Sequence, residues 1–126
     1  GGGTVQIANT IAPTTYSLAI DGKVICEELK IQASADWADY VFANDYALKS
    51  FDELRGFIRT HHHLPNIPDA TAIEKNGIDV GDMQKRMMEK IEELTLYILQ
   101  LEEKSQLHEK EIEALKQFRE ERCEKQ

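Results

Sequence analysis

Three consecutive histidines, His61-His62-His63, are the residues whose type most suggests metal chemistry in this chain. Imidazole nitrogens are common ligands of zinc and other transition metals. Three adjacent residues at the end of a helix cannot all point at one ion, because successive side chains leave a helix in different directions. Cationic histidines near a helix C-terminus also interact favourably with the helix dipole. We therefore predict a helix end followed by a solvated loop, with a metal site as the alternative, and no cofactor.

Cysteine content and charge indicate which metal sites and which kinds of partner are not expected. Cys26 and Cys123 lie far apart and belong to no motif, so we predict two free thiols rather than a disulfide or a metal site. The 126 residues include 23 acidic and 15 basic side chains, for a formal net charge of −8. The sequence has no basic stripe with interleaved aromatics and no transmembrane run. Nucleic acid and the membrane interior are therefore not expected partners.

The element that must position any functional residue is a heptad repeat in the C-terminal third. Read from Ile91, core side chains recur at alternating spacings of three and four, with Ile at position a and Leu at position d. A helix from Met83 to about Glu124 would be roughly 63 Å long, too long to bury this seam on so small a domain. We therefore predict self-association. The predicted core positions are Ile91, Leu94, Ile98, Leu101, Ser105, His108, Ile112 and Leu115.

The flanking charges predict the orientation of the copies. Lys104 with Glu109, and Glu111 with Lys116, occupy a g position and the following e position. In a parallel, in-register assembly both pairs are opposite in sign, although each exposed pair contributes only about 0.2–1 kcal/mol. A single long solvated helix with incidental charges is the alternative. Ile at a and Leu at d also favour two strands in isolated coiled coils, which makes a dimer the alternative to a trimer.

The seam contains one polar stretch, formed by Ser105 and His108. In a parallel assembly each His108 would face its copies near the axis. A buried polar layer of this kind selects the register of a coiled coil. Binding of an anion or a metal by this layer is the alternative interpretation.

The N-terminal part of the chain has the alternation that is typical of strands. Residues 16–20 alternate apolar and small polar side chains, Asp21-Gly22 suits a two-residue hairpin turn, and residues 23–26 resume the pattern. One hairpin is marginal alone, so we expect its apolar face to pack on identical hairpins of neighbouring chains.

The middle of the chain predicts a small helical head. Ser50 and Glu53 form a capping box that begins a helix ending near His61. Asp69 is expected to cap a short helix that stops at Asn76-Gly77, and Asp79 to cap the long helix. The predicted head core comprises Trp37, Tyr40, Phe42, Leu54, Phe57 and Ile58. An aromatic binding platform is the alternative role for Trp37, Tyr40 and Phe42.

Four stretches together resemble a known family. They are Ala35-Asp36-Trp37-Ala38-Asp39-Tyr40-Val41-Phe42, His63-Leu64-Pro65-Asn66-Ile67-Pro68, Asn76-Gly77-Ile78-Asp79-Val80-Gly81 and Lys90-Ile91-Glu92-Glu93-Leu94-Thr95-Leu96-Tyr97. They resemble a C-terminal domain common on Bacteroidetes surface and tail-fibre-like proteins, a group similar to the chaperone-of-endosialidase family. Residues 16–23 resemble the last shaft repeat of such fibres.

The resemblance implies a homotrimeric module that brings three chains into register so that a β-rich fibre shaft upstream can assemble. It also implies an extracellular location, on a cell surface or at a phage or virion fibre tip. Many family members cut themselves at a serine beside a Ser-Asp-x-Arg-x-Lys pattern. Here Ser34 is followed by Ala35-Asp36-Trp37, without the Arg and the Lys, so we predict no catalytic residue and no self-cleavage.

Together these patterns predict an α+β fold with three parts. Residues 1–33 would form a β-rich shaft end, residues 34–81 a small head with short helices, and residues 82–126 a parallel, trimeric coiled coil. The predicted function is C-terminal trimerisation and assembly of a fibre or adhesin. A self-cleaving serine protease domain and a fibre tip that binds a surface receptor or a glycan are the alternatives.

Overall fold

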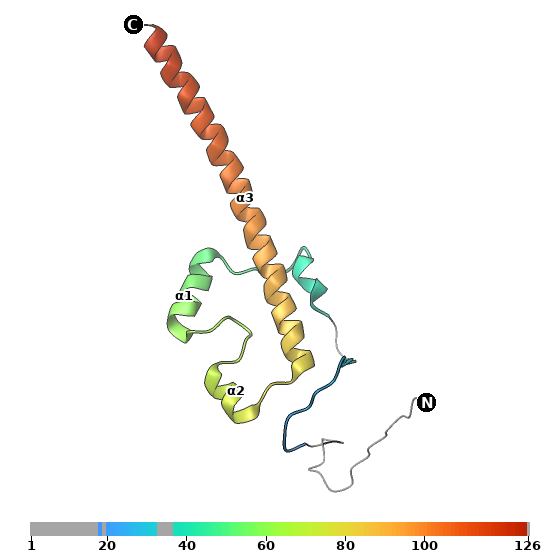
Figure 1. Ribbon diagram of the computed structural model, residues 1–126. Helices are drawn as coiled ribbons and strands as arrows, with labels where there is room; N and C mark the ends of the chain where they lie inside the picture. The colour runs from blue at the N-terminus through green and yellow to red at the C-terminus, as the bar shows by residue number, and fades with distance from the viewer. Residues whose placement is uncertain (1–17, 19, 33–36, 126) are drawn as a thin grey trace. The chain divides into compact units, whose positions relative to one another are not determined.

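The regular elements of this computed structural model are all helical within the residues that it describes, which are 18, 20–32 and 37–125. The chain divides into two compact units, Gly1–Ile31 and Gln32–Gln126, and the helices of the described residues all belong to the second unit. In chain order these are the 3₁₀ helix η1 (Ala38–Phe42), α1 (Phe51–His61), α2 (Ala70–Asn76) and α3 (Val80–Glu124) (Figure 1).

The predicted α+β class is wrong, because residues 20–32 contain no strand and no hairpin. Asp21 and Gly22 form a bend, and no strand follows it in residues 23–32. Val24 is 68% exposed and Ile25 is 99% exposed, so the alternating pattern buries no face in a single chain. The physical reason is that a strand requires a neighbouring backbone, and a lone hairpin is marginal. The rest of the predicted strand region, residues 4–17 and 19, lies outside the described residues.

Helix α1 begins and ends where the sequence predicts. The hydroxyl of Ser50 accepts from the backbone N–H of Glu53 at 3.2 Å, and the Glu53 carboxylate accepts from the Ser50 N–H at 2.8 Å. The backbone hydrogen bond from Ser50 lowers the pKa of Glu53. At the other end His62 adopts a left-handed conformation with φ of 58° and donates its N–H to the carbonyl of Ile58. Both predicted boundaries are therefore confirmed.

The start of α2 has its predicted cap, and α3 starts directly after the predicted residue, Asp79. The Asp69 side chain accepts from the N–H of Ala72 at 2.7 Å, and Gly77 ends α2 with φ of 73°. Asp79 precedes α3 as predicted, but its side chain makes no capping hydrogen bond. The 45 residues of α3 span about 68 Å at the usual rise per residue. Within the described part of the chain, no helix is long and apolar enough to cross a membrane.

The buried apolar side chains lie on η1 and on α3, two elements that pack against each other. They are Ala38 and Val41 of η1 and Tyr97 of α3, which differ from the predicted head core. Residues three apart share a face of a 3₁₀ helix, so Ala38 and Val41 lie on the same, buried face of η1. Trp37, Tyr40 and Phe42 are 40–55% exposed in the single chain. Of the remaining predicted core residues, Leu54 and Phe57 are half-buried and Ile58 is exposed.

Candidate self-association surface

Helix α3 has two faces of opposite character. The side facing the head buries three charged residues, Glu89, Lys90 and Glu92, each at most 9% exposed. The other side carries the apolar residues of the heptad, and Ile91 and Ile98 are 52% and 63% exposed. A helix of a monomeric globular protein normally does the reverse, with its apolar stripe facing the core. The exposed apolar face is therefore the candidate functional surface.

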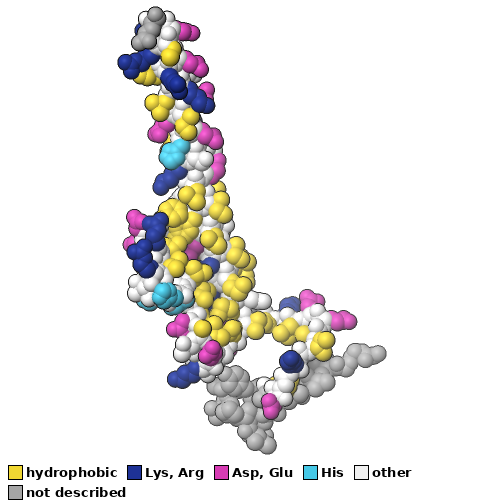
Figure 2. Space-filling model, turned by 60° about the vertical axis from the view of Figure 1, so that its left-hand side comes forward, with side chains coloured by type: hydrophobic (Ala, Val, Ile, Leu, Met, Phe, Trp, Pro, Cys, Tyr) yellow, Lys and Arg dark blue, Asp and Glu magenta, His cyan; other side chains and the backbone are white. Residues whose placement is uncertain are grey.

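All eight predicted core positions are exposed in the single chain. Met87, at the preceding d position and 54% exposed, extends the same line toward the start of α3. Figure 2 shows hydrophobic side chains gathered where α3 meets the head, and mixed charges along the rest of the helix. We call this line the α3 seam. It comprises Met87, Ile91, Leu94, Ile98, Leu101, Ser105, His108, Ile112 and Leu115.

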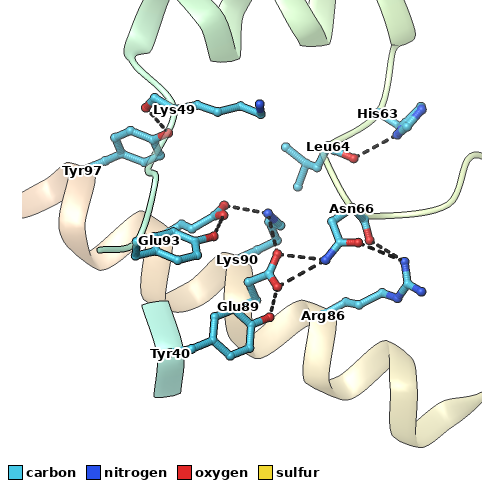
Figure 3. A network of polar contacts seen from close by, with 11 residues as sticks. Tyr40, Lys49, His63, Leu64, Asn66, Arg86, Glu89, Lys90, Glu93 and Tyr97 are labelled. Atoms are coloured by element: carbon cyan, nitrogen blue, oxygen red, sulfur yellow. Dashed lines mark hydrogen bonds and ion pairs between the residues drawn. The ribbon is translucent and has the colours of Figure 1, made fainter. Parts of the chain in front are cut away.

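On the opposite face, Glu89 is the centre of a polar network that joins α3 to the head (Figure 3). Its carboxylate accepts hydrogen bonds from the Tyr40 hydroxyl and, at 3.0 and 3.2 Å, from the Asn66 amide. The Lys90 ammonium lies 3.0 Å from it. Burial opposes ionisation of Glu89, but these partners outweigh burial and hold its pKa below the usual value. The hydrogen bond from the Tyr40 hydroxyl to Glu89 raises the pKa of Tyr40 to about 12.

Lys90 and Glu93 continue this network one turn along α3. The Lys90 ammonium lies 2.7 Å from the Glu93 carboxylate, so one cation serves two carboxylates. The Tyr46 hydroxyl donates to the other oxygen of Glu93 at 2.5 Å. Burial and this hydrogen bond raise the pKa of Tyr46. These buried charges are therefore paired and hydrogen-bonded, which is the condition under which burial of a charge is tolerated.

Two further contacts fasten the head to α3. The Tyr97 hydroxyl donates to the carbonyl of Lys49 at 2.7 Å, and its ring lies 5.0 Å from that of Phe51. The Arg86 guanidinium donates to the carbonyl of Asn66 at 2.8 Å. Burial raises the pKa of Tyr97. These contacts hold the head against the first part of α3.

Glu92 differs from the other buried charges. One oxygen of its carboxylate is buried and has no hydrogen-bond partner among the described residues. Burial, and secondarily the nearby Asp39 carboxylate, raise the pKa of Glu92. Glu92 therefore opposes the head–helix contact when it is ionised, whereas Glu89 and Glu93 support that contact.

A small apolar recess lies beside the α3 seam, on the border between α3 and the head. Because Leu94 belongs both to the recess and to the seam, a chain that packs on Leu94 would also meet the head. The surface available to a partner is thus wider than the heptad positions alone. The recess is lined by Leu54, Leu64, Pro65, Lys90, Glu93, Leu94 and Tyr97.

The remaining sequence-derived candidates are the three histidines, the two cysteines and Ser34. The His61 ring stacks on Phe57 at 4.1 Å, and the His63 ring nitrogen lies 2.9 Å from the carbonyl of Leu64. Within the described residues of one chain, no three His, Cys, Asp or Glu side chains are placed to hold a metal. Cys26 and Cys123 are free and exposed. Ser34 lies outside the described residues.

The sequence pattern located the seam but not the polar network, whose members come from segments far apart in the chain. Tyr40 and Glu89 are separated by 49 positions, and no local spacing links them. A scan against protein-family models, a search of curated proteins and a search of solved structures found no match to this chain.

Proposed function

We propose that this chain is a trimerising C-terminal assembly module of an extracellular or phage-type fibre or adhesin. The observation that supports this proposal most directly is the inverted burial pattern of α3. The head covers the charged face, while the apolar α3 seam is exposed from Met87 to Leu115. The partner that fits this surface is a second and a third copy of the same chain.

The energetics of the seam favour association. Fully burying an Ile or Leu side chain gains roughly 1.5–3 kcal/mol relative to leaving it exposed. The six Ile and Leu residues of the seam are 51–68% exposed in the single chain, so each has about half of that gain still available. Association is the way to obtain it, because the head already packs on the opposite face of the helix.

Charge pattern supports identical copies in parallel. Lys104 would face Glu109 of a neighbouring copy, and Glu111 would face Lys116, so both pairs attract only when the helices run in the same direction and in register. Against an unrelated partner these pairs would have no reason to match. The family resemblance supports three chains, whereas the Ile and Leu arrangement by itself supports two.

The assembly mechanism is a rise in local concentration. Coiled-coil contacts are local in sequence and form quickly, whereas intertwined strands of a shaft have high contact order and form slowly. Joining three chains at one end makes shaft formation an intramolecular step. Val24, Ile25 and Leu29 are exposed in their own unit, and in this proposal they find partners in the same segment of neighbouring chains.

Light scattering of the purified chain tests the proposal. A trimer has three times the monomer mass of 14.4 kDa. A monomer at micromolar concentration would refute self-association. A mass of twice 14.4 kDa would keep self-association but replace the trimer with a dimer.

A further inference from the structure

We propose that the trimer binds one divalent transition-metal cation on its axis, held by three copies of His108. This inference rests on the proposed trimeric assembly. It assigns a ligand to Ser105 and His108, the polar stretch that interrupts the apolar side chains of the α3 seam.

The register of α3 brings the three imidazoles together. His108 occupies a d position of the same continuous helix and the same seam as Leu101 and Leu115. In a parallel, in-register trimer the three d side chains of one layer meet at the axis. Three His nitrogens with an open fourth position form a common zinc site in proteins, with Zn–N distances of about 2.0–2.1 Å. One chain supplies a single ligand, so the site exists only in the assembly.

The surroundings of His108 favour a metal cation over an empty polar layer or an anion. Neutral imidazoles in this layer would otherwise be buried polar groups without charged partners. Ser105, in the next layer toward the N-terminus, is small and leaves room for a water molecule as the fourth ligand. Residues 102–113 carry five acidic and two basic side chains, a charge balance that attracts cations.

Zinc is the cation that fits this donor set best. Imidazole nitrogen binds zinc, copper and nickel well, and zinc accepts a tetrahedral arrangement without a preference imposed by its d electrons. Metal binding requires neutral imidazole, so affinity should fall as the solution becomes acidic.

The test uses a background in which His108 is the only strong nitrogen or sulfur ligand. The chain has four His and two Cys, so His61→Ala, His62→Asn, His63→Ala, Cys26→Ser and Cys123→Ser remove all others. Asn replaces His62 because that position has φ of 58°, and Asn tolerates this conformation. After treatment with EDTA, zinc is titrated by calorimetry, and cobalt is used to follow the coordination geometry by absorbance.

The expected result is one zinc ion per three chains, a tetrahedral cobalt spectrum, and a Tm that rises by roughly 5 °C or more at saturating zinc. The matched variant adds His108→Leu to the same background. It should stay trimeric and should lose both zinc binding and the rise in Tm.

The outcomes separate the two proposals. A chain that forms no trimer with or without zinc would overturn the proposed assembly, and the site with it. A trimer that binds no zinc, or that binds it equally well after His108→Leu, would overturn the metal site and leave the assembly proposal standing.

Discussion

The two halves of α3 differ in what keeps them ordered. Residues 80–100 pack on the head through contacts made within one chain, such as those of Glu89 and Tyr97. Residues 101–125 have only exposed side chains in the single chain. Most helix stability in proteins comes from tertiary packing of an apolar face, and residues 101–125 have no such packing within one chain. The first half therefore has packing partners within one chain, whereas stabilisation of the second half by other copies stays a prediction.

The largest expected effect comes from breaking the seam where the two halves meet. Ile98→Asp places an unpaired charge in every chain of one core layer, and burying such a charge is strongly unfavourable. We expect light scattering to show that self-association is lost. Hydrogen exchange should show that the backbone amides of residues 101–125 lose their protection. Gln100→Asp adds the same charge off the seam and should leave the mass unchanged. An Ile98→Asp variant that keeps the parent mass would show that the seam is not the interface.

The next effect concerns the first half alone. Lys90→Met removes the cation between Glu89 and Glu93, whose side chains are 7% and 17% exposed. Leaving partners of a buried ion pair uncompensated costs roughly 3–5 kcal/mol. Urea unfolding should show a loss of that order. Lys110→Met, at an exposed position, should stay within about 0.5 kcal/mol of the parent. Equal effects of the two substitutions would mean that the head–helix network adds no stability.

A smaller effect is expected at the start of α1. Ser50→Ala removes the side-chain half of the capping box and should cost about 1 kcal/mol of unfolding free energy. The oligomeric mass should not change, because Ser50 is not one of the seam residues. In a double-mutant cycle with Glu53→Ala, the two losses should be non-additive, since each side chain caps the other residue's backbone. Fully additive losses would contradict the capping box.

The smallest expected effect is a gain in stability, unlike the losses above, and it depends on pH. Because the pKa of Glu92 is raised in the folded chain, its contribution favours folding below the unfolded pKa of about 4.3 and is lost as pH rises through the folded value. Glu92→Met should therefore stabilise the chain at pH 7, and this advantage should shrink toward pH 4. Tm measured across that range checks the prediction.

The adjacent residue supplies the control for this prediction. Glu93→Met removes the partner of Tyr46 and Lys90 and should destabilise the chain at pH 7. If both substitutions shift Tm in the same direction, the difference between a paired and an unpaired buried carboxylate does not hold here.

Sequence alone correctly predicted the helix boundaries around α1 and α2, and the residue that precedes α3. Ser50, Asp69 and Gly77 act on backbone groups within four positions, so their roles depend on local geometry and little else. The register of the α3 seam is equally local, because the helical period determines which side chains share a face. That the seam is the interface between copies stays a prediction.

The tertiary structure determines which face of α3 the head covers. The local heptad pattern predicts that this face is exposed to solvent. Glu89 and Glu93 occupy heptad positions that are normally solvated, yet they accept hydrogen bonds from groups 23 to 49 positions away. The strand prediction was wrong for a related reason, since alternation specifies a strand only where another backbone can pair with it. Caps and helical phase are properties of a few neighbouring residues, whereas burial of a charge or a strand depends on partners that only the folded chain brings together.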